Sequence, residues 1–174
     1  MAGFSGFDPV IRRFGGIASR RELLDAGWSE TDLWFALSYG NLSRIRRGWF
    51  AASDLSDDAR RAWRAGGPLA CVSALLHHGL LDAAPSDDAL GLHICLPSDG
   101  HLPASDGSLP TDEQPSLVVH WSTTDRRSGT RRAVTPAVAL RQARACSNGT
   151  RARVAEVPLV RVRRVSADGR RPGE

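Results

Sequence analysis

Histidine and cysteine are the residue types in this chain that could bind a metal or act as nucleophile and base. The five histidines are His77, His78, His93, His101 and His120, and the three cysteines are Cys71, Cys95 and Cys146. His93 and Cys95 are two residues apart, so a strand would place both on one face, where a site with His120 is conceivable. These residues lack the short-loop ligand pairs of zinc modules. We therefore expect ordinary partly buried side chains, with no metal and no other cofactor.

No motif in the chain indicates catalysis. The GxSxG, Walker, GxGxxG and HExxH patterns are absent. The cysteines are odd in number and far apart, which indicates neither a disulfide framework nor a zinc ribbon. We predict a protein that is not an enzyme and has no catalytic residues.

Arginine is the other residue type of interest, because it can hold phosphate oxygens. All 23 basic residues are arginines, a bias that a GC-rich genome would explain by itself. Arg44, Arg46 and Arg47 lie together in a segment of strand-like period, where alternation puts Arg44 and Arg46 on one face. The guanidinium group suits phosphate, so these three are our best candidates for DNA contact. The alternative is a solvated hairpin whose arginines reflect composition alone.

Three helices and a hairpin must position these arginines. Apolar spacing and turn residues predict the three helices at residues 7–14, 19–26 and 29–39. The hairpin is predicted at 42–52, with its turn at Arg47-Gly48. The second and third helices open with capping signals, Ser19 with Glu22 and Ser29 with Asp32. We expect the third helix to turn Leu33, Leu37 and Trp34 inward. The tryptophans Trp28, Trp34, Trp49 and Trp63 are predicted to be core or interface residues.

A second domain and a tail follow. Helices are predicted at 54–66, 68–81 and 135–146, and strands at 91–96 and 116–121. The fold class is therefore α+β: a winged helix-turn-helix over 1–53, a small mixed domain over 54–149, and a disordered Arg-rich tail over 150–174. In the helix predicted over 68–81, Pro68 is expected at the first helical position.

The charge balance permits nucleic-acid binding without indicating it. The net charge is +4 and the pI is about 9.7. Residues 151–174 carry seven arginines and three acids, 7 − 3 = +4, so the rest of the chain is neutral. The sequence shows no secretory leader and no apolar run of membrane-spanning length. We expect a soluble, cytoplasmic protein without a membrane partner.

Residues 15–53 resemble the N-terminal winged helix-turn-helix domain of AbiEi-type antitoxins. The likeness rests on Gly15-Gly16, the Ser19-capped helix with Leu23-Leu24, Ala26-Gly27, and the run from Gly40 to Trp49-Phe50. It covers residues 11–52. Residues 66–81 and 134–146 are similar to the middle region of actinobacterial proteins that carry this domain. In many of those a nuclease-like domain follows, but this chain has no run with the acid spacing of its metal site.

The resemblance implies a transcriptional regulator of a type IV toxin–antitoxin system. Such a protein binds double-stranded DNA at its own promoter, represses its operon and counters a nucleotidyltransferase toxin, and a homodimer would read paired half-sites. The third helix would enter the major groove while the hairpin, or wing, touches the DNA backbone. The implied contacts are Arg44, Arg46, Arg47, Arg20, Arg21, Thr31, Ser38 and Tyr39.

The predicted third helix also supports other interpretations. It contains no arginine, and its acids Glu30 and Asp32 repel phosphate. A helix that mainly packs would suit a protein-interaction module that has lost DNA binding. A truncated remnant of a nuclease-fusion protein is a further alternative. For Arg20 and Arg21 the alternative interpretation is plain surface charge.

Overall fold

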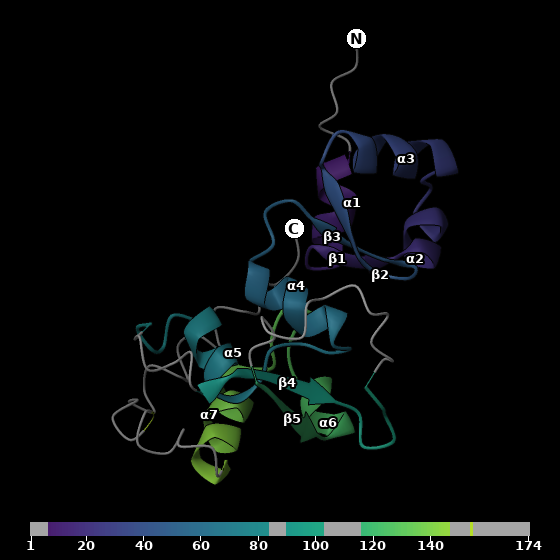
Figure 1. Ribbon diagram of the computed structural model, residues 1–174. Coiled ribbons are helices and arrows are strands. Elements are labelled where there is room, and N and C mark those ends of the chain that lie inside the picture. The colour runs from purple at the N-terminus through teal and green to yellow at the C-terminus, as the bar shows by residue number, and fades with distance from the viewer. Residues whose placement is uncertain (1–6, 84–89, 103–115, 147–153, 155–174) are drawn as a thin grey trace, which may run out of the picture. The chain divides into compact units, whose positions relative to one another are not determined.

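Two units of mixed α and β structure make up the chain in the computed structural model (Figure 1). The structure describes residues 7–83, 90–102, 116–146 and 154, and this part holds seven helices and two small sheets. The division falls between Arg64 and Ala65, and we call residues 1–64 the N-terminal unit and 65–174 the C-terminal unit. The predicted boundary at residue 53 comes earlier in the chain. The predicted disordered tail lies outside the described residues, apart from the buried Val154.

The N-terminal unit alternates helices with the strands of one antiparallel sheet. Its elements are α1 (Phe7–Arg13), β1 (Ile17–Ser19), α2 (Arg20–Asp25), α3 (Glu30–Ser38), β2 (Leu42–Arg46), β3 (Trp49–Ala52) and α4 (Asp57–Arg64). The strand order is β1-β3-β2. The predicted helices and the hairpin are confirmed with slightly shorter bounds. Strand β1 is missing from the prediction because three residues are too few to show alternation.

Capping boxes fix where α2 and α3 begin. The backbone N–H of Ser19 donates to Glu22 Oε2 at 2.9 Å, and the N–H of Glu22 donates back to Ser19 Oγ. Ser29 and Asp32 repeat the arrangement, with the Ser29 N–H 2.8 Å from Asp32 Oδ2. These reciprocal bonds satisfy backbone N–H groups that have no partner inside the helix. Both predicted capping signals are confirmed.

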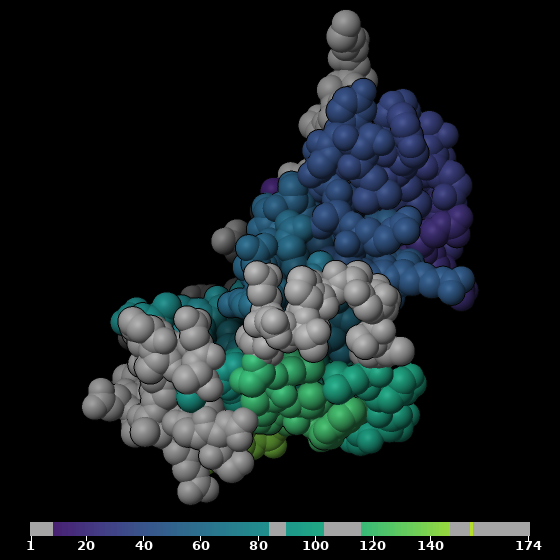
Figure 2. Space-filling view, viewed as in Figure 1, coloured from purple at the N-terminus to yellow at the C-terminus, as the bar shows by residue number. Residues whose placement is uncertain are grey.

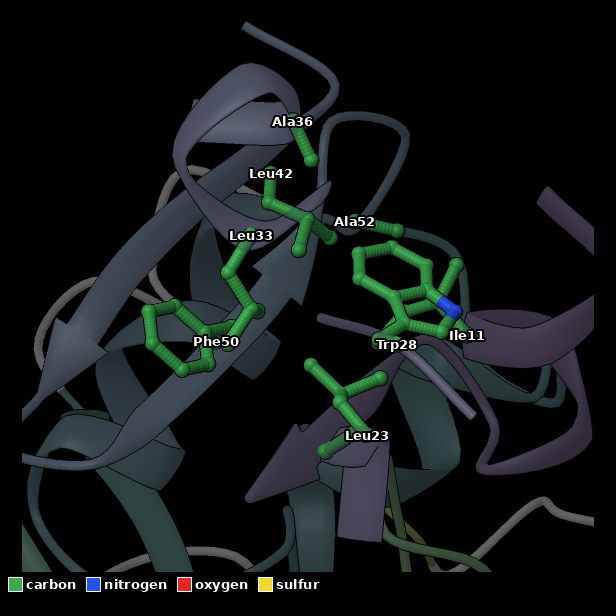
Figure 3. Close-up of a cluster of buried hydrophobic side chains, with 9 residues drawn as sticks. Ile11, Leu23, Trp28, Leu33, Ala36, Leu42, Phe50 and Ala52 are labelled. Carbon is green, nitrogen blue, oxygen red and sulfur yellow. The ribbon is translucent and has the colours of Figure 1, made fainter. Parts of the chain in front are cut away.

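The core of the N-terminal unit is a cluster in which all three helices preceding the hairpin meet the sheet (Figure 3). Its buried members are Ile11, Ala18, Leu23, Trp28, Leu33, Ala36, Leu42, Phe50 and Ala52. The prediction that Trp34 faces inward is wrong, since its side chain is 63% exposed. Leu33 and Ala36 form the buried stripe of α3, and Trp34 lies about 100° further round the helix.

Arg60 on α4 joins this helix to the β2–β3 hairpin. Its Nε donates to the Leu55 carbonyl at 2.9 Å, and its Nη2 donates to the Ala52 and Ser53 carbonyls at 2.8 and 2.6 Å. Its Nη1 donates to the Ser43 hydroxyl on β2. A planar, five-donor guanidinium is the side chain that can satisfy several acceptors at once. Arg60 is therefore a structural arginine.

The C-terminal unit combines two parallel strands with a pair of packed helices, α5 and α7. Its elements are α5 (Cys71–His77), β4 (Leu92–Leu96), β5 (Leu117–Trp121), α6 (Thr123–Arg126) and α7 (Pro136–Ala145). The register aligns His93 with Val118 and Cys95 with His120. Helix α5 packs against α7 and β4. The predicted strands and the helix α7 are confirmed, and Thr135 is the N-cap residue of α7. The one-turn helix α6 has no counterpart in the prediction.

The start of α5 differs from the prediction. Residues 68–70 are extended instead of helical, and Leu69 bridges both Ile94 and Ala133. The Leu69 N–H donates to the Arg132 carbonyl, and its carbonyl accepts from the Val134 N–H, both at 2.9 Å. These hydrogen bonds come from distant segments, so apolar spacing alone could not reveal them. No helix in the described segments is long and apolar enough to cross a membrane.

Replacing Arg60 by Lys should destabilise the N-terminal unit. Lys keeps the charge but cannot reach four acceptors, so we expect Arg60→Lys to lower the free energy of unfolding by about 2 kcal/mol. Urea denaturation followed by tryptophan fluorescence measures this. The matched control is Arg61→Lys, whose exposed side chain pairs with Asp58 on the same helix; its effect should stay within about 0.5 kcal/mol. Equal losses in the two variants would contradict the role given to Arg60.

Candidate nucleic-acid interface

Two arginines of the β2–β3 hairpin point into solvent. Arg44 on β2 and Arg47 at the turn are exposed, and neither side chain makes an ion pair or hydrogen bond with another described residue. The blue part of the surface that includes this hairpin is open to view in Figure 2. Gly48 completes the turn with φ of 73°, a backbone conformation that glycine adopts readily. The turn thus presents two cations that no described acid neutralises.

Arg46 lies in a different environment from its neighbours. Its Cζ is 5.1 Å from the centre of the Trp49 ring and 5.5 Å from that of Trp63, and the side chain is half-buried. The strand register shifts between Arg44 and Arg46, so the simple alternation expected for these two residues is interrupted. Arg46 is held against aromatic rings, which makes it a structural residue first and a DNA contact only if it leaves them.

Arg20 and Arg21, predicted to touch phosphate, both lie in surface ion pairs. Arg20 pairs with Glu30 at the start of α3, and Arg21 pairs with Asp25 at 3.7 Å along α2. All four side chains are more than half exposed. Such pairs contribute little to stability, so an incoming phosphate could compete for either arginine. The Arg20–Glu30 pair also offsets one of the two acids on α3.

The exposed face of α3 is polar and aromatic. Thr31, Ser38 and Tyr39 are exposed as the DNA-contact prediction requires, and Trp34 lies on the same side at helical spacing. The Tyr39 ring stacks on Phe35 with centroids 6.0 Å apart. Hydrogen bonds from the Ser29 hydroxyl and then its backbone lower the pKa of Asp32, which therefore stays negative. This face offers hydroxyl donors without any cation.

The histidines fall into two groups. His101 is exposed, and His78 Nε2 is hydrogen-bonded to the Val134 carbonyl at 2.8 Å. His93 is buried beside the half-buried His120, with His93 Nδ1 3.1 Å from His120 Nε2. Burial, then the nearby His120, lowers the pKa of His93 to about 4; burial also lowers the pKa of His120. Both rings are therefore neutral at pH 7.

The cysteines that lie beside the His93–His120 pair differ from Cys95, the cysteine that the sequence suggested as their partner. Cys95 turns its thiol to the Ser122 carbonyl at 3.6 Å, and burial raises its pKa to about 11. Cys71 and Cys146 instead bring their thiols to the two imidazoles. Sequence reasoning missed both, because the four residues come from four separate elements and show no ligand spacing.

The exposed arginines of the hairpin, the exposed face of α3 and the histidine–cysteine cluster are thus the features of the described residues from which function can be argued. No protein-family model and no curated protein matches the sequence. What the chain does must therefore be inferred from these residues.

Replacing Arg46 should destabilise the protein more than replacing Arg44. We expect Arg46→Ala to lower the free energy of unfolding by about 1–2 kcal/mol, because it removes a cation and its methylene stem from two aromatic rings. Arg44→Ala should change it by less than about 0.5 kcal/mol. Thermal denaturation of both variants tests this. Similar melting shifts for the two would show that Arg46 is no more structural than Arg44.

Proposed function

We propose that the N-terminal unit is a winged helix-turn-helix that binds double-stranded DNA, and that the chain is a transcriptional regulator rather than an enzyme. The element order supports this: helix, short strand, two helices and a two-stranded hairpin. In such a module α3 lies in the major groove and the β2–β3 hairpin is the wing. The antiparallel β1-β3-β2 sheet and the common core are consistent with that assignment.

The observation that carries the proposal is the exposure of Arg44 and Arg47 without an acidic partner. An arginine that is not paired with a carboxylate of the protein keeps its guanidinium group available for phosphate. Arg binds phosphate oxygens through two parallel N–H donors. Arg20 and Arg21 would add contacts by exchanging Glu30 and Asp25 for phosphate. Phosphate contacts of this kind position the protein and make its affinity depend on salt.

Helix α3 would supply sequence preference through hydroxyl groups. Thr31, Ser38 and Tyr39 can donate to base edges or to phosphate, and no arginine on α3 reads guanine. The negative charge of Asp32 limits how closely this helix approaches the backbone. We therefore expect a regulator of modest affinity whose wing provides much of the binding energy.

The resemblance to AbiEi-type antitoxins extends the proposal to a biological setting. The chain would bind its own promoter, repress its operon and counter a nucleotidyltransferase toxin. A homodimer would place two wings on paired half-sites about one helical turn apart. The partner and the promoter sequence are the parts of this proposal that depend on the resemblance alone.

DNA binding should depend on Arg44 and Arg47 more than on charge in general. Fluorescence anisotropy against the upstream promoter duplex and a scrambled duplex, over a series of salt concentrations, measures it. We expect the Arg44→Ala/Arg47→Ala variant to bind the promoter about tenfold or more weakly, with a salt slope reduced by about 2.

The matched control is Arg61→Ala/Arg64→Ala, which removes two exposed charges from α4 of the same unit. It should bind with nearly the wild-type affinity and slope. Equal weakening of both variants would mean that the chain binds DNA through its overall charge. Equal affinity for the promoter and scrambled duplexes would contradict the proposed role as a transcriptional regulator, because it would show binding without sequence preference.

The exposed aromatic residues of α3 favour a second candidate function, protein recognition. Trp34 and Tyr39 are each 63% exposed on a helix without cations, and aromatic residues are enriched where proteins bind one another. If the wild-type chain fails to bind either duplex, this function takes precedence. Trp34→Ala should then abolish co-purification with the product of the neighbouring gene, while Arg44→Ala should leave it intact.

A further inference from the structure

Four side chains of the C-terminal unit converge in a cluster unrelated to the proposed DNA interface. Cys71, His93, His120 and Cys146 each bring one donor atom within 4.8 Å of the other three. They come from the start of α5, from β4, from β5 and from the residue that ends α7. Cys71 and His93 are fully buried, and His120 and Cys146 are half-buried.

We propose that this cluster is a structural zinc site in which Cys71, His93, His120 and Cys146 are the four ligands. Two thiolates and two imidazoles are a donor set that Zn²⁺ takes in structural sites, in tetrahedral coordination. The protein fills all four positions, so no position is left for water or a substrate. The site therefore serves stability rather than catalysis.

The distances suit a tetrahedral ion. Zinc bonds of about 2.3 Å to sulfur and about 2.0–2.1 Å to nitrogen place the ligand atoms about 3.3–3.8 Å apart. The two imidazole nitrogens are already 3.1 Å apart. Because no pair of donors exceeds 4.8 Å, closing the shell requires donor separations to change by about 1 Å or less.

Hydrogen bonds around the cluster hold the ligands in place. His93 Nε2 lies 3.1 Å from the Leu90 carbonyl, which can only accept, so this nitrogen carries the proton and Nδ1 presents its lone pair to the cluster. A backbone carbonyl on the second ring nitrogen is the usual support of a zinc-bound histidine. The His93 backbone is fixed as well, since its N–H donates to Ser73 Oγ at 3.0 Å.

The backbone of Cys71 has an unfavourable conformation that its surroundings maintain. Its φ of +50° makes it the one non-glycine residue with positive φ among the described residues. This conformation costs a residue with a Cβ atom free energy, and such residues concentrate at functional sites. The buried Gln142 accepts the Cys71 N–H at 3.1 Å, and the N–H of Ala70 donates to the His93 carbonyl at 2.9 Å. These contacts point the start of α5 at the cluster.

The charges of the site also balance. The two cysteines bind as thiolates, each releasing its proton to solvent, and their two negative charges cancel the charge of Zn²⁺. His120 binds through Nε2 as a neutral ring with its proton on Nδ1. Burial therefore leaves no net charge behind, which is the condition under which ions are tolerated away from water.

A zinc ion would connect elements of the C-terminal unit that are not joined by strand pairing. Its described sheet has two strands, too few to be stable without further packing. The ion joins both strands to the beginning of α5 and the end of α7. Binding free energy of this kind is folding free energy, so removal of the metal should loosen this unit and leave the ligand-free N-terminal unit folded.

Metal analysis of the full chain tests the site. After purification under reducing conditions and dialysis against Zn²⁺, we expect one zinc per chain by mass spectrometry. We expect Co²⁺ to substitute with the visible absorption of tetrahedral thiolate coordination. Cys71→Ser and Cys146→Ser should each weaken zinc binding by more than about 100-fold in competition with a chromophoric chelator, since even outer-shell losses cost about 10–100-fold.

The control is Cys95→Ala, which removes a cysteine two residues from His93 whose thiol bonds to Ser122. It should keep one zinc per chain with affinity within about threefold of wild type. Folded wild-type chain that takes up no zinc, or a Cys71–Cys146 disulfide in anaerobically purified protein, would overturn the proposal. Zinc loss in Cys95→Ala equal to that in Cys71→Ser would also overturn it. Because no ligand lies in the N-terminal unit, these results are independent of DNA binding.

Discussion

The pairing of β2 with β3 determines which arginines of the N-terminal unit meet solvent. The short turn at Arg47-Gly48 leaves Arg47 at the tip, and the register shift in β2 separates the environments of Arg44 and Arg46. On the far side of β3, β1 fixes the strand, and the Arg20 N–H donates to the Gly48 carbonyl at 2.8 Å. The same contact therefore ties the hairpin turn to the start of α2. If the hairpin did not pair in this register, the two exposed cations would have no fixed position.

Two arginines that resemble the exposed pair in sequence have structural roles instead. Arg46 covers Trp49 and Trp63, and Arg60 holds the ends of β2 and β3 through the carbonyls and hydroxyl it satisfies. In a chain that has arginine as its only basic residue, residue type carries little functional information. Exposure and the absence of a described acidic partner distinguish Arg44 and Arg47 from Arg46 and Arg60, and their place on the hairpin distinguishes them from the equally exposed Arg13 and Arg64.

Local signals in the sequence predicted local structure well. The capping boxes at Ser19 and Ser29, the turn at Gly48 and the short apolar strands β4 and β5 all depend on residues within a few positions of one another. The failures involve distant partners. The start of α5 moved because Leu69 pairs with Ile94 and Ala133, and Trp34 faces outward because Leu33 and Ala36 meet the sheet.

The histidine–cysteine cluster shows the same limit in the candidate sites. The sequence placed His93 and Cys95 on one strand face and made a site with His120 conceivable, since alternation within a strand is a local property. Cys71 and Cys146 enter only through the packing of α5 against α7 and the extended chain before α5. No spacing in the sequence encodes these contacts, so the nearest cysteine in the chain, Cys95, took their place in the prediction.

The central claim is that the hairpin contacts DNA, and NMR titration of the full chain with its upstream promoter duplex tests it most directly. The side-chain Nε–H signals of Arg44 and Arg47 and the backbone amides of residues 44–48 should shift at the lowest DNA concentrations. The side-chain signal of Arg60 should not move, because Arg60 is held within the protein. Shifts confined to the C-terminal unit, with the hairpin unchanged, would contradict the account.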